Sequence, residues 1–137
     1  MKQQILIVDD SKPISYLLQT ILRKKFQVIT APDGYAAMRW LSKKNFPALI
    51  IASPRLPEMQ NWEMIEHLRS SGIYGDIPVI VLSGLDKQET AGKCAELGVE
   101  AYYMKPFNPV DLEKNICNLL SLQGRSVEEE TPRLQAV

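Results

Sequence analysis

Residues 5–11 read ILIVDDS, a short apolar run that ends in two carboxylates and a hydroxyl. A run of four apolar residues without alternation is typical of a parallel strand that is buried on both faces of a sheet. Pro13 follows at a position that suits the first turn of a helix. The segment therefore predicts a buried strand that leads into a helix, with Asp9 and Asp10 at the turn between them.

The same order of strand and helix recurs along the chain. Strands are expected at 5–8, 26–30, 48–52, 77–82 and 101–104, and helices are expected to begin near Pro13, Asp33, Trp62, Lys87 and Pro109. Gly72 and Gly98 are expected to end the third and fourth helices, because glycine favours the left-handed backbone of a helix C-terminus. Five strand–helix units in one chain of 137 residues predict a single α/β domain, a doubly wound parallel sheet with right-handed crossovers.

Polar side chains end or follow four of the predicted strands. The first strand is followed by Asp9 and Asp10, the third by Ser53, the fourth by Ser83 and the fifth by Lys105. In a doubly wound sheet the carboxyl ends of the strands border one crevice, where ligands bind. The sequence therefore predicts one polar site that is assembled from four strand ends.

These segments resemble the receiver domain of bacterial response regulators, similar to the single-domain chemotaxis regulator. The resemblance covers roughly residues 3–122 and is carried by ILIVDDS at 5–11, LPEM at 56–59, VIVLSG at 79–84 and GVEAYYMKPF at 98–107. It implies a flavodoxin-like (βα)5 fold with strand order 2-1-3-4-5 and a cis bond between Lys105 and Pro106. We expect a receiver domain over 1–122 and a flexible polar tail over 123–137.

The resemblance also implies roles for the residues at the strand ends. In that family an aspartate after the third strand accepts a phosphoryl group from a histidine kinase. An acidic pair, that aspartate and a backbone carbonyl two residues further on hold Mg²⁺. Carried over, the acidic pair is Asp9 and Asp10, the groups that contact the phosphoryl oxygens are Ser83 and Lys105, and the aromatic that moves on switching is Tyr102.

The acceptor position of this pattern is Ser53, and the correspondence fails there. An unactivated serine is a poor nucleophile, and the neighbouring carboxylates belong to the expected metal site. Serine also removes a negative charge and an oxygen ligand from Mg²⁺, so we expect weak or absent Mg²⁺ binding at Asp9 and Asp10 and no other cofactor. Either Arg55 or Lys105 is expected to take the place of the cation, unless Arg55 points into solvent.

Neighbours of Ser53 also depart from the family pattern, at Ala48, Ala52, Pro54 and the pair Gln60-Asn61. Asn61 stands where the family has glycine, and asparagine tolerates a left-handed backbone. We therefore expect a left-handed residue at position 61. The several departures together indicate a natural pseudo-receiver, not an ordinary receiver with one engineered change.

The leading hypothesis is a non-enzymatic receiver in two-component signalling that binds proteins without being phosphorylated. Its partner would be a histidine kinase or a downstream effector, bound through Tyr102, Tyr103 and the outward sides of 87–97 and 109–121; simple edge packing is the other interpretation of the tyrosines. One alternative is a phosphorylatable receiver in which Asp9, Asp10 or a hydroxyl is the acceptor. Another is a flavodoxin-like ligand binder, which the two carboxylates after the first strand disfavour because they repel an anion.

Composition narrows the partner classes. Lys plus Arg and Asp plus Glu number 16 each, so no global field favours nucleic acid or an anionic membrane. The N-terminus has no signal-peptide pattern, and no apolar run is long enough to span a bilayer. We expect a cytoplasmic protein, a monomer or weak dimer, with Cys94 and Cys117 as free, buried thiols.

Overall fold

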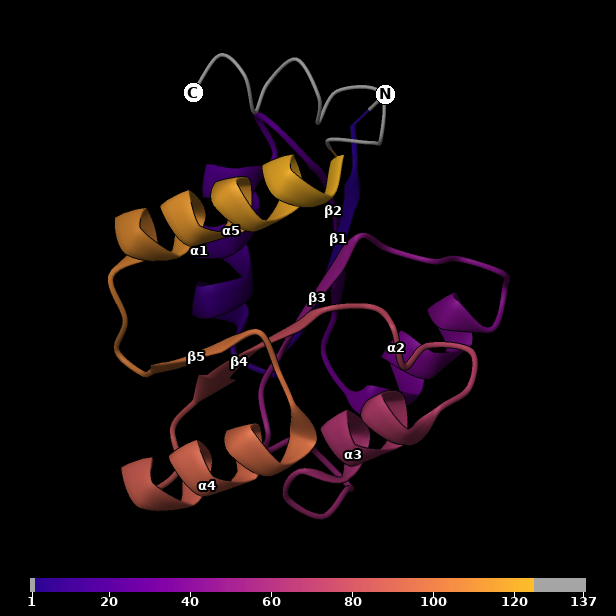
Figure 1. The fold of residues 1–137 in the computed structure, drawn as a ribbon, viewed down its shortest axis with the longest axis vertical. Helices are drawn as coiled ribbons and strands as arrows, with labels where there is room; N and C mark the ends of the chain where they lie inside the picture. The colour runs from indigo at the N-terminus through magenta and orange to yellow at the C-terminus, as the bar shows by residue number, and fades with distance from the viewer. Residues whose placement is uncertain (1, 125–137) are drawn as a thin grey trace. The chain divides into compact units, whose positions relative to one another are not determined.

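The structure is a computed structural model that describes residues 2–124, and it contains five strands that alternate with five helices (Figure 1). The strands are β1 (Gln4–Val8), β2 (Gln27–Ala31), β3 (Leu49–Ala52), β4 (Val79–Ser83) and β5 (Ala101–Met104). The helices are α1 (Lys12–Leu22), α2 (Gly34–Leu41), α3 (Glu63–Ser70), α4 (Lys87–Leu97) and α5 (Pro109–Gly124). The strands and the first four helices form one compact unit, and α5 belongs to a second unit that begins at Asn108.

All strand pairs are parallel, and their order is β2-β1-β3-β4-β5. The predicted fold class and strand order are therefore confirmed. In the register of the sheet Val8 lies beside Ala52, and Ser83 lies beside Met104. The residues that follow β1, β3 and β5 consequently emerge at the same edge as the end of β4.

The three central strands form the core of the first unit. Every residue of β3 and β4 and the last four residues of β1 are buried. Each aliphatic side chain buried in this way contributes roughly 1.5–3 kcal/mol before the entropic cost of ordering the chain. On one face, Leu6, Val8 and Ile50 pack in a single cluster with buried residues of α2, α3 and α4. The strand ends that carry the polar residues are thus fixed to a rigid sheet.

Side-chain caps explain where three helices begin. Ser11 accepts a hydrogen bond from the Ile14 amide at the start of α1, and Asp33 and Asp86 cap α2 and α4 in the same way. Each cap satisfies a backbone N–H that has no partner inside the helix. Gly98 ends α4 with a φ of 65°, as predicted.

Two expectations about the third helix are wrong. The left-handed residues in the loop before it are Glu58 and Trp62, not Asn61, and α3 begins at Glu63. The Trp62 amide donates to the Pro54 carbonyl at 2.7 Å while its ring is buried, so tertiary contacts override the local preference of asparagine. At the other end α3 stops at Ser70 with the next residue extended, two residues before the predicted Gly72.

The remaining differences are small shifts of boundaries. β2 lies one residue later than predicted, and β4 begins two residues later and includes Ser83. Gln123 and Gly124, expected in the tail, complete α5; residues 125–137 of that predicted tail lie outside the described residues. Over residues 2–124, no helix is long and apolar enough to cross a bilayer.

Alkaline pH is expected to destabilise the fold through Cys94, which is buried on α4. Burial raises the pKa of its thiol from 9.0 to about 11, because the thiolate would lose its hydration. The folded chain then keeps a proton that the unfolded chain releases above its pKa of 9.0. The part of the unfolding free energy that comes from this pKa difference is fully present below pH 9.0 and is lost as the pH rises through about 11.

Urea unfolding across this pH range tests the effect. Cys94→Ala should show a shallower loss of unfolding free energy than the parent protein, and Cys117→Ala, at a half-buried position, should follow the parent. Equal slopes for the parent and Cys94→Ala would contradict the prediction.

Candidate functional site

The strand ends surround a cavity of about 250 Å³ in the first unit. Its walls are formed by Asp10, Ser53, Arg55, Leu56, Pro57, Gly84, Leu85 and Lys105. Four of the predicted site residues therefore line one cavity, contributed by the ends of β1, β3 and β5 and by the loop after β3. Asp9 is buried close by, whereas Ser83 and Tyr102 do not line this cavity.

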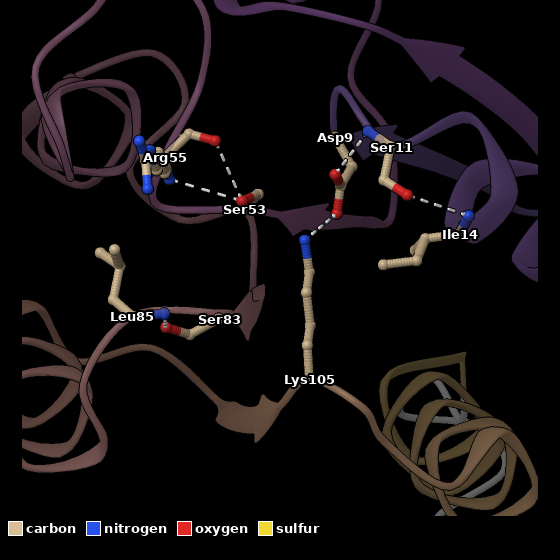
Figure 2. A network of polar contacts seen from close by, with 8 residues as sticks. All are labelled: Asp9, Ser11, Ile14, Ser53, Arg55, Ser83, Leu85 and Lys105. Carbon is tan, nitrogen blue, oxygen red and sulfur yellow. Dashed lines mark hydrogen bonds and ion pairs between the residues drawn. The ribbon is translucent and has the colours of Figure 1, made fainter.

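Asp9 and Lys105 form the central ion pair of the site (Figure 2). Asp9 Oδ1 accepts a hydrogen bond from the Ser11 amide at 2.9 Å, and Asp9 Oδ2 lies 2.9 Å from Lys105 Nζ. The two groups are close enough to form an ion pair, but their geometry is not that of a hydrogen bond, and Oδ2 accepts no other hydrogen bond. The ammonium group thus stands beside the buried carboxylate and compensates its charge. The Lys105–Pro106 bond that follows is cis, as the resemblance implied.

The hydroxyl of Ser53 is directed at its own loop. Ser53 Oγ donates to the Arg55 carbonyl at 3.2 Å and accepts from the Arg55 amide at 3.4 Å (Figure 2). Such a turn, closed by a serine hydroxyl, is a common local alternative to a backbone turn. Among the described residues, no carboxylate or imidazole hydrogen-bonds to Ser53 Oγ, so nothing in the site activates it as a nucleophile.

The two candidate cations occupy different places. Lys105 contacts Asp9, whereas the Arg55 side chain is exposed at the rim of the cavity. Within the part of the chain that the structure describes, no carboxylate forms an ion pair with the Arg55 guanidinium. Lys105 and Arg55 are the two cations expected to replace a metal ion. The structure places Lys105 beside the buried Asp9 carboxylate and Arg55 at the rim of the cavity.

Ser83 faces α4 instead of the cavity. Its side chain is fully buried, its Oγ lies 2.7 Å from Thr90 Oγ1, and it accepts a hydrogen bond from the Leu85 amide at 3.0 Å. Thr90 is also fully buried, in the first turns of α4. The hydroxyl predicted to contact a phosphoryl group is thus bonded to α4.

Tyr102 lines a different hollow from the one beside Ser53. With Ala91, Cys94, Ala95, Val99, Glu100 and Ala101, it lines a separate groove of about 340 Å³ between α4 and β5. Its half-buried ring also packs against the core cluster. The structure therefore places Tyr102 in the groove and not in the cavity beside Ser53.

A Mg²⁺ ion needs several free oxygen ligands, usually including carboxylates. Two of the expected ligand oxygens are already engaged. Asp9 Oδ2 lies beside the Lys105 ammonium, and the Arg55 carbonyl, two residues beyond Ser53, accepts a hydrogen bond from the Ser53 hydroxyl. In residues 2–124, no three His, Cys, Asp or Glu side chains converge in a way that could hold a metal ion. The donor set therefore does not fit Mg²⁺.

Comparison with known proteins identifies the fold family. A family model described as the response regulator receiver domain matches residues 5–117. The chain belongs to the response regulator receiver family. This places the receiver in two-component signalling, in which receiver domains interact with histidine kinases and effectors.

Individual relatives agree with this assignment. The receiver is 34% identical over 116 residues to a probable transcriptional regulator, ycf27, of Galdieria sulphuraria, covering 84% of this chain and 44% of the relative. It is 30% identical over 124 residues to histidine kinase P4 of Formosa agariphila, covering 90% of this chain and 9% of that one. The chain thus spans less than half the length of these curated relatives.

Solved structures show the same fold. The signal receiver domain of a histidine kinase from Syntrophus aciditrophicus is 31% identical with a TM-score of 0.79, covering 90% of this chain and 94% of that chain. Chemotaxis response regulator CheY4 of Vibrio cholerae is 27% identical with a TM-score of 0.75, covering 86% and 98%.

Sequence reasoning missed the contacts that hold these groups in place. The role of Thr90 cannot be predicted from sequence, because a buried threonine on a helix carries no distinctive pattern. Trp62 was expected inside a helix, yet its indole Nε1 donates to Glu89 Oε2 on α4 at 2.9 Å. Only the folded structure reveals both residues, because Thr90 meets Ser83 at the end of β4 and Trp62 meets Glu89 on α4.

Proposed function

We propose that this receiver acts as a protein-interaction module whose surface is recognised without phosphorylation at Ser53. The observation that carries the proposal is the turn in which Ser53 Oγ bonds the amide and carbonyl of Arg55. A hydroxyl held by its own loop, with no base bonded to it, is not prepared to attack a phosphoryl donor.

The electrostatics of the cavity support the same proposal. Phosphoryl transfer depends on positioned cations that neutralise the charge on the transferred group, and magnesium ions usually supply much of that charge. In this receiver Lys105 is already paired with buried Asp9, and the donor set does not fit Mg²⁺. Of the two cations that line the cavity, Arg55 and Lys105, only the exposed Arg55 has no carboxylate partner among the described residues.

The groove between α4 and β5 is the surface that we assign to a partner, a histidine kinase or a downstream effector. It is lined by small α4 side chains, Ala91 and Ala95, and by the half-exposed ring of Tyr102. A concave apolar groove with one aromatic wall suits an apolar side chain of another protein. Glu100 adds one carboxylate to the same lining.

Intact-mass spectrometry tests the proposal. The purified protein is incubated with a small-molecule phosphodonor and Mg²⁺, beside a sample without the phosphodonor, and no mass increase is expected. A gain of one acid-labile phosphoryl group would overturn the proposal. That result would favour a substitute acceptor, of which Asp10 is the carboxylate that lines the cavity.

A further inference from the structure

Polar contacts in three places connect α3 and its preceding residue to α4 and its C-cap, and we call these three rungs the polar ladder. Its rungs are Trp62–Glu89, Glu66–Lys93 and the contacts of Arg69 with the carbonyls of Leu97 and Gly98. We propose that the polar ladder locks α4 in one position, so that this receiver presents a fixed α4–β5 surface. The inference rests on the proposed function, because the position of α4 matters for signalling only if a partner reads its surface.

The first rung joins α4 to the loop that carries Ser53. Trp62 is 2% exposed, and its Nε1 donates to Glu89 Oε2 at 2.9 Å. Indole can only donate, and a carboxylate acceptor makes the hydrogen bond stronger than a neutral one. Because the Trp62 amide also donates to the Pro54 carbonyl, the same residue closes the loop and holds the first turn of α4.

The second rung lies one helical turn further along α4. Lys93 Nζ lies 2.8 Å from Glu66 Oε2 and 3.8 Å from Glu96 Oε2. The hydrogen bond to Glu66 is the main cause of a raised pKa for Lys93. Both side chains are partly exposed, so solvent screens this pair and its contribution is small.

The third rung holds the C-terminal end of α4. Arg69 Nε donates to the Leu97 carbonyl at 3.0 Å, and Nη2 donates to the Gly98 carbonyl at 3.3 Å. These carbonyls have no partner within the helix, and the planar guanidinium satisfies both at once. Arg69 Nη1 also donates to the Ile77 carbonyl just before β4, at 3.1 Å, which fixes the guanidinium itself.

The spacing of the rungs makes the polar ladder continuous. Glu89, Lys93 and Leu97 follow one another at intervals of four residues, which places them on one side of α4. On the side that faces the sheet, the buried Thr90 hydroxyl bonds Ser83. Any displacement of α4 must therefore break contacts on two of its sides, and Ser83 cannot turn to the cavity without leaving Thr90.

Hydrogen exchange of the α4 amides tests the lock directly. Trp62→Phe removes the indole donor without changing α4, and Trp40→Phe on α2 is the matched control outside the polar ladder. We expect the amides of residues 87–97 to exchange about tenfold faster in Trp62→Phe than in Trp40→Phe, since one charge-assisted hydrogen bond is lost. Amides of β1 and β3 should exchange equally in both variants. Equal α4 exchange in the two variants would overturn the inference.

A second pair of variants covers the case in which Trp62→Phe fails to fold. Lys93→Gln removes the middle rung, and Lys87→Gln, on the same helix, changes an exposed lysine outside the polar ladder. Exchange in α4 should rise about twofold in Lys93→Gln and stay unchanged in Lys87→Gln; equal rates would contradict the lock. No phosphodonor is present in these measurements, so their outcome is independent of the mass measurement that tests the proposed function.

Discussion

Replacing Ser53 with aspartate is expected to raise the affinity of the receiver for Mg²⁺ by about tenfold or more. The introduced carboxylate adds a third acidic ligand to Asp9 and Asp10, which suits the preference of Mg²⁺ for oxygen donors. It also removes the hydroxyl that now donates to the Arg55 carbonyl, which leaves that oxygen available to a metal ion. Isothermal titration with MgCl₂ measures the change.

The matched control is Ser53→Asn, which has nearly the shape of aspartate but no charge. Its affinity for Mg²⁺ should remain as weak as that of the parent protein. If Ser53→Asp and Ser53→Asn bind Mg²⁺ equally, the missing carboxylate is not what disfavours the metal in this cavity.

Replacing Lys105 with methionine is expected to lower the free energy of unfolding by about 3 kcal/mol, because it leaves a buried carboxylate without its countercharge. Asp9 is 3% exposed, while the Lys105 side chain is 22% exposed, so the loss falls mainly on Asp9. Methionine keeps the unbranched stem of lysine and isolates the effect of the charge. Urea unfolding at neutral pH measures the difference.

The double variant Asp9→Asn/Lys105→Met separates charge from packing. Removing both charges should recover most of the lost unfolding free energy, since no uncompensated ion then remains in the interior. If the double variant is as unstable as Lys105→Met alone, the lysine stabilises the site through its packing and not through the ion pair.

Much of the architecture could be predicted because it depends on short-range pattern. The apolar runs of β1, β3 and β4 carry no alternation, and this alone indicates strands buried on both faces. Because the strands are parallel, their carboxyl ends lie together at one end of the sheet. The position of Ser53 and Lys105 at one cavity can therefore be predicted before any contact is known. The cap at Gly98 follows in the same way from its local backbone preference.

The orientation of side chains could not be predicted, because it depends on partners that are distant in sequence. The Ser53 hydroxyl could point to its own loop or into the cavity, and its hydrogen bond to the Arg55 carbonyl fixes it on the loop. The Ser83 hydroxyl could point into the cavity or to Thr90, and in the structure it bonds Thr90. The left-handed backbone at Trp62 is unfavourable for a bulky residue, and only the burial of its ring and the bond to Glu89 explain why it is kept.

Trp62 also makes the receiver its own optical probe. The chain has two tryptophans, so Trp40→Phe leaves Trp62 as the only indole fluorophore. Its ring is shielded from water, and its N–H is bonded to a carboxylate on α4. Separation of α3 from α4 would admit water to the ring and shift its emission to longer wavelength. If α4 is locked, binding of another protein in the α4–β5 groove should therefore leave this emission unchanged, and the comparison needs no attached dye.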